Sequence, residues 1–313
     1  MTKPIVVVGS INLDLVATVG RIPVPGETIA GTQFKTYFGG KGANQAVAVG
    51  KLGYPVTMLG KVGNDSFGLQ LRAALSDAGV DASLVETAAC SSGVAVISTT
   101  LQGENSIIVI PGANGEITCD DLDRRRSVIE AAGMVLTQLE IPLPVIERLA
   151  EITSAAGVPL MLDPAPARPL SDRLLRNVDW ITPNESETRL LLNMGGSDLG
   201  PKDATRAAQA LLDRGARNVV LKMGERGAFL AESNGKSTFI PAYAVKAVDT
   251  TAAGDAFNGA FAVGLMLGKS SEESARFGSA VAAISVTRHG AQPSMPTAQE
   301  VERFIEGQAV TRF

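Results

Sequence analysis

The chain reads Asp249-Thr250-Thr251-Ala252-Ala253-Gly254-Asp255 and continues as an apolar run from Ala256 to Leu267. This pattern predicts the start of a buried helix whose first backbone amides are unshielded. Free amides and the helix dipole favour a bound anion such as a phosphate, and we expect the N–H groups of Ala253, Gly254 and Asp255 to face it. Asp255 would then reach the group that attacks the phosphate. The alternative is an ordinary aspartate cap on a buried helix.

A second glycine-rich segment lies far upstream and reads Gly39-Gly40-Lys41-Gly42-Ala43-Asn44-Gln45-Ala46-Val47-Ala48. Helix propensity explains a lysine between two glycines poorly, so we interpret Lys41 as a binding residue. A solvent-exposed lysine is the alternative. Two polar, glycine-rich helix starts in one chain indicate two halves of one site.

The composition limits the class of protein. A chain of 313 residues with 45% hydrophobic content can bury a sizeable core. With 28 Lys+Arg against 32 Asp+Glu and a net charge of −4, it offers no basic surface for nucleic acid or anionic lipid. The longest apolar segment, from Ala256 to Leu267, is shorter than the roughly 20 residues of a membrane span. We therefore expect a soluble protein without nucleic-acid or membrane partners.

Cysteine and histidine are too scarce for two common kinds of site. The chain has two cysteines, Cys90 and Cys119, and one histidine, His289. These residues cannot assemble a disulfide framework or a His/Cys metal site. The apolar stretch at the N-terminus is too short for a signal peptide and ends in a glycine turn. A reducing compartment is indicated, and we expect the protein in the cytoplasm.

Short β-branched runs alternate with helical patterns along most of the chain. We expect strands at Ile5 to Val8, Val56 to Leu59, Met134 to Leu139, Pro159 to Leu162, Trp180 to Thr182 and Val219 to Lys222. We expect helices at Ala43 to Leu52, Gly68 to Ala78, Leu143 to Ala156, Lys202 to Arg214 and Ala256 to Leu267, each followed by a glycine. The alternation predicts an α/β fold with a central, mostly parallel sheet and helices on both faces.

Two regions lack helices between their Thr- and Val-rich stretches, about 13–37 and 93–110. We expect antiparallel strands there that form a small β-sheet lid on a single domain of residues 1–313. Unpaired lid edges would promote association unless they are covered. This favours a homodimer in which two lids meet.

Two common phosphate-binding motifs are absent. The segment Gly235-Lys236-Ser237 lacks a glycine five residues earlier, where Leu230 stands, so the P-loop spacing fails. The first strand is followed by Gly9-Ser10-Ile11-Asn12-Leu13-Asp14 rather than by a dinucleotide fingerprint. Asn12 and Asp14 at a strand end indicate recognition of hydroxyl groups instead.

Taken together, these segments closely resemble the phosphofructokinase-B-type, ribokinase-like family of sugar kinases, and the resemblance covers essentially the whole chain. The matching motifs are Gly9 to Asp14, Pro25-Gly26-Glu27-Thr28, Phe38 through Ala46, Asp163-Pro164-Ala165-Pro166-Ala167, Thr182-Pro183-Asn184-Glu185-Ser186-Glu187, Asp249 through Asn258, and Gly290-Ala291-Gln292-Pro293-Ser294. The Asp249 motif indicates the family as a whole. The segment from Gly39 to Ala46 favours a member that acts on ribose.

The resemblance implies transfer of the γ-phosphoryl group of ATP to the 5-hydroxyl of D-ribose. Asp255 would be the base, supported by the backbone of Ala252, Ala253 and Gly254. The residues implied for sugar binding are Asn12, Asp14, Gly40, Lys41, Gly42, Ala43, Asn44, Glu140 and Asp255. Fixed donors and acceptors suit this role, because an unpaired buried hydroxyl is costly and thereby enforces specificity.

The resemblance also implies a nucleotide site. Its residues would be Asn184, Lys222, Met223, Gly224, Glu225, Arg226, Gly227, Gly254 and Ser279. The glycines Gly224 and Gly227 fit a hairpin turn as well, and both interpretations can hold together. Glu187, three residues after Asn184, would act on Mg²⁺ through water, since magnesium keeps several of its waters. The alternative for Glu187 is a partner of the helix dipole in a first turn.

A monovalent cation site, taken to hold K⁺, is implied beside the anion site. Its residues would be Asp249, Thr251, Ser285, Arg288, Gly290 and Ser294. An ion held by carbonyl oxygens can order the loop that presents the amides. The chain departs from the family pattern at Ala252, where a glycine is usual, at Ser279, where relatives carry a larger polar residue, and at Lys222, where a small hydroxyl residue is usual.

The sequence leaves the acceptor open. The same scaffold phosphorylates 2-deoxyribose, other sugars and nucleosides, and discrimination by a single hydroxyl group depends on contacts that the sequence alone does not position. A sugar-binding sensor without catalysis is a further alternative. The intact Asn184, Gly254 and Asp255 argue against it, because a sensor has no need of groups that transfer a phosphoryl.

Overall fold

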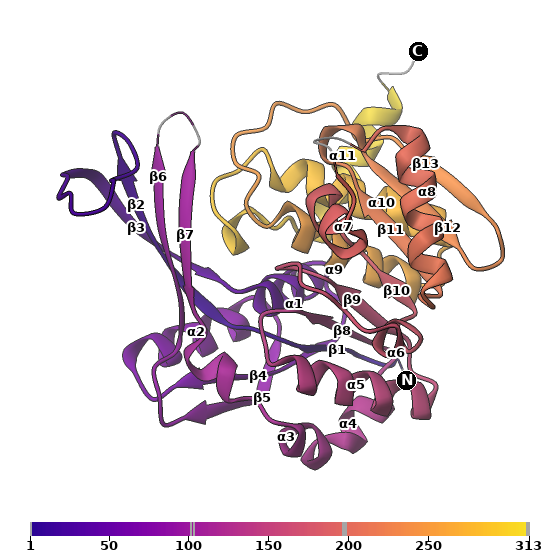
Figure 1. Cartoon of the computed structure of the whole chain (residues 1–313), viewed down its shortest axis with the longest axis horizontal. Helices are drawn as coiled ribbons and strands as arrows, with labels where there is room; N and C mark the ends of the chain where they lie inside the picture. The colour runs from indigo at the N-terminus through magenta and orange to yellow at the C-terminus, as the bar shows by residue number, and fades with distance from the viewer. Residues whose placement is uncertain (1, 101, 103, 196–198, 311–313) are drawn as a thin grey trace.

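A nine-stranded sheet runs through the body of the molecule in the computed structural model (Figure 1), which describes residues 2–100, 102, 104–195 and 199–310. Its strands lie in the order β13 (Ser237–Ile240), β12 (Ala228–Glu232), β11 (Asn218–Lys222), β10 (Trp180–Ile181), β9 (Leu160–Asp163), β8 (Met134–Gln138), β1 (Ile5–Val8), β4 (Val56–Gly63), β5 (Asp81–Ala88). All neighbours from β11 to β5 pair in parallel, while β12 pairs antiparallel with both β11 and β13 and so runs opposite to the other strands of this sheet. The predicted fold class is confirmed.

Helices cover both faces of this sheet. Along β1, Ile5 and Val7 point into one apolar core and Val6 and Val8 into the other, and all four are fully buried. The first core is completed by α1 (Lys41–Lys51), α2 (Ser66–Asp77), α9 (Ala253–Met266), α10 (Ser271–Ser285) and α11 (Ala298–Val310). The second is completed by α3 (Cys119–Arg124), α4 (Arg126–Ala131), α5 (Leu143–Ala156), α6 (Asp172–Leu175), α7 (Glu185–Leu192) and α8 (Pro201–Asp213). Continuous apolar strands such as β1 are therefore required by burial on both sides.

The predicted helices are present, with ends that move by a few residues. The glycines expected to stop them, Gly53, Gly79, Gly157, Gly215 and Gly268, all have positive φ, a conformation that costs a glycine little. Helix α9 starts at Ala253, before the apolar run, and packs on the sheet through Phe261, whose ring lies 4.9 Å from that of Trp180. In the described part of the chain, no helix has both the length and the apolarity to cross a membrane.

A separate four-stranded sheet projects from the body of the molecule (Figure 1). Its order among the described residues is β3 (Gly31–Gly39), β2 (Asn12–Val19), β6 (Gly93–Thr100), β7 (Asn105–Ile110). The two outer pairs are antiparallel, as expected, but β2 and β6 are parallel, so the prediction of antiparallel strands throughout was wrong. The chain passes through β4, α2 and β5 before β6, and so β6 enters from the same end as β2. Residues 101 and 103 of the predicted lid segment lie outside the described residues.

Candidate active site

Polar side chains gather at the carboxyl ends of the parallel strands. Strand β1 lies between β4 and β8. The strands that follow it first in sequence, β4 and β5, lie on one side of it, and β8 to β13 lie on the other, so the strand order reverses at β1. Open α/β sheets bind ligands at such a point. Ser10 follows β1, Glu140 follows β8, Asp163 ends β9 and Lys222 ends β11.

Asp255 lies in the first turn of α9 with only 4% of its surface exposed. Its Oδ2 accepts a hydrogen bond from Asn44 Nδ2 at 3.0 Å, and its Oδ1 accepts one from Gln45 Nε2 at 3.1 Å. Both donors belong to α1, which approaches α9 closely because Gly259 has no side chain. A Cβ on Gly259 would lie 2.7 Å from the Cβ of Ala48. The carboxylate is therefore buried and held by two amide donors of α1.

Burial raises the pKa of Asp255 to about 6, since the ionised form loses water. The nearby Lys41 and the amides of Asn44 and Gln45 oppose this shift, while Asp163 adds to it. A carboxylate with a pKa slightly below neutral is largely ionised at pH 7 and still accepts a proton readily. Asp255 thus has the properties of a general base.

The start of α9 presents two backbone amides without a hydrogen-bond partner among the described residues, those of Gly254 and Asp255, where we expected three. The hydrogen bonds of the described residues include none from the backbone N–H of Gly254 or Asp255. The amide of Ala253, which we expected to be free, instead donates to the carbonyl of Thr250 at 3.2 Å. Ala252 precedes the helix with φ of 59°, the left-handed conformation that a glycine adopts more easily.

Glu140 connects the predicted sugar-binding residue Lys41 to Ser10, which we did not predict as a site residue. Its Oε2 accepts hydrogen bonds from Ser10 Oγ at 2.6 Å and from the backbone amide of Lys41 at 3.1 Å. Gly42 must be a glycine here, because its Cβ would lie 2.7 Å from the carbonyl carbon of Gly9. Ala43 is fully buried and contributes packing, with its amide bonded to the carbonyl of Ser10.

Asn12 and Asp14 lie on β2, where the projecting sheet meets the main one. Burial, together with the charges of Glu140 and Asp255, raises the pKa of Asp14 to about 7, and Lys41 lowers it. Asp14, Glu140, Asp255 and Lys41 therefore belong to one electrostatic cluster. Gly40 caps α1 with φ of 84°, and a Cβ there would lie 2.6 Å from the amide of Asn12.

Four further residues belong to this cluster although we did not predict them as site residues. Gln45 Nε2 also donates to Asp163 Oδ2 at 3.0 Å, Gln138 Nε2 donates to Gln45 Oε1 at 2.7 Å, and Asn114 Nδ2 donates to Asn12 Oδ1 at 2.7 Å. Gln45 and Asp163 lie in segments that matched the family, so their motifs were a usable signal. Gln138 and Asn114 had no such signal.

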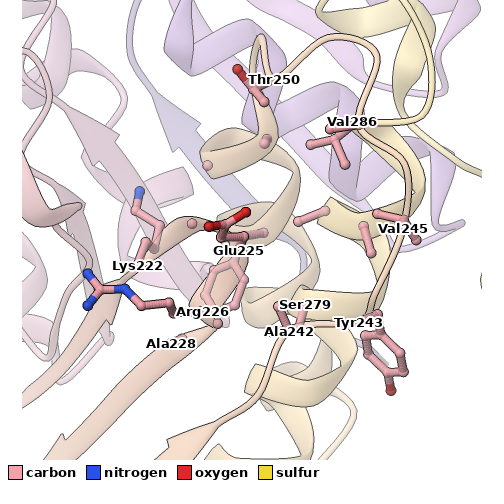
Figure 2. Close-up of a pocket in the computed structure, with 18 of the residues that line it drawn as sticks. Lys222, Glu225, Arg226, Ala228, Ala242, Tyr243, Val245, Thr250, Ser279 and Val286 are labelled. Atoms are coloured by element: carbon pink, nitrogen blue, oxygen red, sulfur yellow. The ribbon is translucent and has the colours of Figure 1, made fainter. Parts of the chain in front are cut away.

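A cavity of about 850 Å³ opens on the other side of the α9 start (Figure 2). Of the predicted nucleotide residues, Lys222, Gly224, Glu225, Arg226, Gly227, Gly254 and Ser279 line it. In Figure 2, Lys222 and Arg226 lie on one side and Tyr243 and Val245 on the other. The segment Gly224 to Gly227 also turns between β11 and β12, so the hairpin interpretation is confirmed, and nucleotide binding by this segment stays a prediction.

Two predicted nucleotide residues lie elsewhere. Met223 is buried in the apolar core at 2% exposure, and it does not line the cavity. Asn184 caps α7, where its Oδ1 accepts from the amide of Glu187 and its Nδ2 donates to Glu187 Oε1, both at 2.8 Å. Glu187 in turn accepts from the amide of Asn184 at 2.7 Å. This reciprocal cap places Glu187 in the first turn of α7, where the alternative of a helix-dipole partner expected it.

Glu187 retains features that suit an indirect magnesium contact. Burial raises its pKa, Lys222 lowers it, and the negative charge of Asp163 raises it again. A hydrated cation between two such carboxylates would relieve their repulsion. No cluster of three or more Asp, Glu, His or Cys side chains that could hold a metal occurs among the described residues. The donor set therefore fits a water-mediated ion and not a cage of carboxylates.

The predicted cation loop is tied together by Asp249. Its Oδ1 accepts from the amide of Thr251 at 2.9 Å and its Oδ2 from the amide of Gly290 at 2.8 Å. Burial raises the pKa of Asp249, but these hydrogen bonds outweigh it, so that the pKa lies below its ordinary value. The hydroxyls of Ser285 and Ser294 donate to Ala282 and Ala291, and the Arg288 guanidinium pairs with Glu300. Asp249 thus connects the segment of Thr251 to the segment of Gly290 by hydrogen bonds to both backbones, and the cation site itself stays a prediction.

Comparison with known proteins places these groups in context. Residues 2–298 match the pfkB family of carbohydrate kinases. A ribokinase of Haemophilus influenzae is 41% identical over 307 residues, covering 98% of this chain and 99% of that protein. A deoxyribokinase of Salmonella typhi is 37% identical over 304 residues, covering 96% and 98%. The solved structure of an Arabidopsis thaliana ribokinase complexed with ribose and ATP matches with a TM-score of 0.90 at 36% identity, covering 98% and 99%.

Proposed function

The chain belongs to the pfkB family of carbohydrate kinases, and on that premise we propose that it phosphorylates D-ribose at the 5-hydroxyl with ATP. The products are D-ribose 5-phosphate and ADP. Ribokinases match over nearly the full length, and the matching Arabidopsis structure holds ribose and ATP. The chain is accordingly a phosphotransferase with an alcohol group as acceptor.

The observation that carries this proposal is the place of Asp255. The buried carboxylate sits between the polar cluster of Asp14, Lys41 and Glu140 and the cavity that Gly254 lines. A sugar bound on one side and a nucleotide on the other would meet at the start of α9. That arrangement supports direct transfer between the two ligands.

In our proposal each group of residues has a separate role in phosphoryl transfer. Asp255 accepts the proton of the sugar hydroxyl, whose oxygen attacks the γ-phosphorus. The amides of Gly254 and Asp255 stabilise the charge that develops on the phosphoryl oxygens, since the transition state is loose and highly charged. Asn12, Asp14, Lys41, Asn44 and Glu140 position the sugar by hydrogen bonds, which supplies much of the acceleration.

The test measures ADP formation from MgATP with D-ribose, 2-deoxyribose, fructose and adenosine in parallel. We expect ribose to give the highest kcat/KM. Preference for another acceptor would refute the assignment of the sugar pocket and leave the phosphoryl-transfer centre in place. A chain that binds ribose but forms no ADP with any acceptor would be a sensor.

2-Deoxyribose is the second candidate acceptor. The deoxyribokinase of Salmonella typhi is almost as similar to the chain as the ribokinases are. A site that hydrogen-bonds the 2-hydroxyl discriminates strongly against a sugar that lacks it, because buried polar groups are then left unpaired. Comparable rates on the two sugars would favour the broader activity.

Magnesium and potassium are included in the proposal. Magnesium supplies neutralisation of the phosphate charge when bound, and Glu187 would hold one of its waters. Asp249, with backbone carbonyls of Thr251 and Gly290, would hold a potassium ion that keeps the α9 start ordered. Equal activity with sodium or potassium as the sole monovalent cation would contradict the second assignment. Titration of each ion against the melting temperature tests binding apart from turnover.

We also propose a homodimer formed through the projecting sheet. Strand β7 is one of the two outer strands among the described residues of this sheet. Its side chains Ile107, Ile108, Val109 and Ile110 are 52%, 63%, 47% and 42% exposed. A contiguous exposed apolar strand marks an association surface. Light scattering should give twice the chain mass, and Ile108→Lys should give a monomer. The control Leu69→Lys, at a leucine on α2 that is 75% exposed, should remain dimeric.

A cytoplasmic location completes the proposal. Cys90 and Cys119 are both free, which suits a reducing compartment. Fractionation of the source cells with an antibody to the chain tests this, and recovery outside the cytoplasmic fraction would contradict it.

A further inference from the structure

Lys222 holds an unusual position at the end of β11. Its side chain is only 13% exposed, and its Nζ lies 3.0 Å from Oδ1 of Asp163, which is 3% exposed. A buried ion pair of this kind gains little stability, because both charges lose their water. Fold stability therefore does not explain why a lysine and an aspartate are paired at this buried position.

The ammonium group also borders the two ligand sites. Lys222 lines the cavity, and a Cβ placed on Gly254 would lie 3.2 Å from its Nζ. The positive charge of Lys222 therefore lies close to the free backbone amides at the start of α9. Arg226, the other cation that lines the cavity, is engaged by Glu185 and the carbonyl of Leu199. Figure 2 shows both side chains on the same side of the cavity.

We propose that Lys222 is a catalytic residue that donates hydrogen bonds to the terminal phosphate of ATP, with Asp163 as the residue that positions it. This inference rests on the proposed function. An ammonium group has three donors, and Asp163 takes one. The remaining two can reach phosphoryl oxygens at the start of α9 while the bond to Asp163 keeps the flexible side chain in place.

Asp163 extends this arrangement to the base. Its Oδ2 accepts from Gln45, which also donates to Asp255. The lysine, its carboxylate and the base are therefore held in one hydrogen-bonded chain. The ammonium group of Lys222 is therefore oriented before the phosphate binds, so little reorganisation of this donor is needed during phosphoryl transfer.

Calorimetric binding of ATP, ADP and AMP to the full chain, without magnesium or sugar, tests the contact. We expect Lys222→Met to weaken ATP binding about tenfold or more and to leave AMP binding unchanged. Lys246→Met is the matched control, because this exposed lysine lies between two residues that line the cavity. Equal losses in the two variants, or a loss for AMP as large as for ATP, would overturn the proposal.

Kinetics and a second variant complete the test. Lys222→Met should lower kcat about 10²-fold, as the loss of a donor to transition-state charge does. Asp163→Asn should lower kcat with ATP affinity retained, because the lysine is present but no longer oriented. If Lys222→Met fails to fold, the double variant Lys222→Met/Asp163→Asn removes both charges and should show the same loss of ATP binding. Unchanged ATP binding in it would refute the contact. Wild-type protein that forms no sugar phosphate would refute the proposed function instead.

Discussion

Replacing Gln45 by methionine should move the pH range in which the enzyme is active. Gln45 Nε2 donates to Oδ1 of the buried Asp255, so the hydrogen bond stabilises the ionised carboxylate. Methionine has a similar length and no donor. Loss of the bond disfavours the charged form and raises the pKa of Asp255, which already lies at about 6.

The size of the effect follows from the energy of one hydrogen bond to a charge. Such a bond contributes roughly 1.5–3 kcal/mol, and about 1.4 kcal/mol corresponds to one pH unit. The pKa of Asp255 should therefore rise from about 6 to roughly 7–8. The ionised fraction at pH 7 falls from about 90% to between roughly 50% and 10%. At pH 9 both proteins should be fully ionised and similarly active.

The assay is kcat from pH 5 to pH 9, with ribose and MgATP saturating at every pH and potassium constant, because the KM for ribose would also report the titration of Asp14. The acidic limb of the variant should shift to higher pH, while the plateau stays near that of wild type. Gln138→Leu is the control, because Gln138 donates to Gln45 and not to Asp255. A variant with a lowered plateau and an unshifted limb would show that Gln45 acts only on packing. An equal shift in Gln138→Leu would refute the direct contact.

Three more predictions follow from the same contacts. Asp255→Asn should lower turnover about 10²–10⁴-fold. It should also remove the pH-dependent loss of stability that wild type shows as pH rises from about 4 to about 7, as measured by denaturation curves across that range. The sign follows because the folded-state pKa of about 6 exceeds the ordinary 3.8, so that ionised Asp255 destabilises the fold as pH rises through that range. A variant that loses stability over this range as wild type does would contradict the assignment. For Asp14, with a pKa of about 7, the KM for ribose should rise as pH falls through 7, and Asp14→Asn should abolish that dependence in initial-rate measurements; a persisting dependence excludes Asp14 as its source. Gly42→Ala should lower the melting temperature and raise the KM for ribose, since its Cβ would lie 2.7 Å from backbone at the end of β1. Gly115→Ala, whose Cβ would make only an ordinary 3.5 Å contact, is the control, and equal effects in both would refute the argument.

Local patterns were enough to predict most of the fold. The apolar run of β1 and the helical spacing of α5 depend on neighbours in sequence, and both elements were predicted with the bounds that the structure shows. The orientation of β6 could not be predicted in this way. Whether it runs parallel to β2 depends on the path of the intervening chain, which leaves no local signal.

The sequence by itself determined the family, the helix start near Asp255 and the glycine, Gly254, in its first turn, because these depend on residue type and spacing. Only the tertiary structure decided what surrounds Asp255. Asn44 and Gln45 are 211 and 210 residues away in sequence and reach it through the packing of α1 on α9. The pairing of Lys222 with Asp163 and the raised pKa of Asp255 arise likewise from burial. Desolvation and hydrogen-bond geometry exist only once distant segments are packed together, and they turn a helix start into a site for phosphoryl transfer.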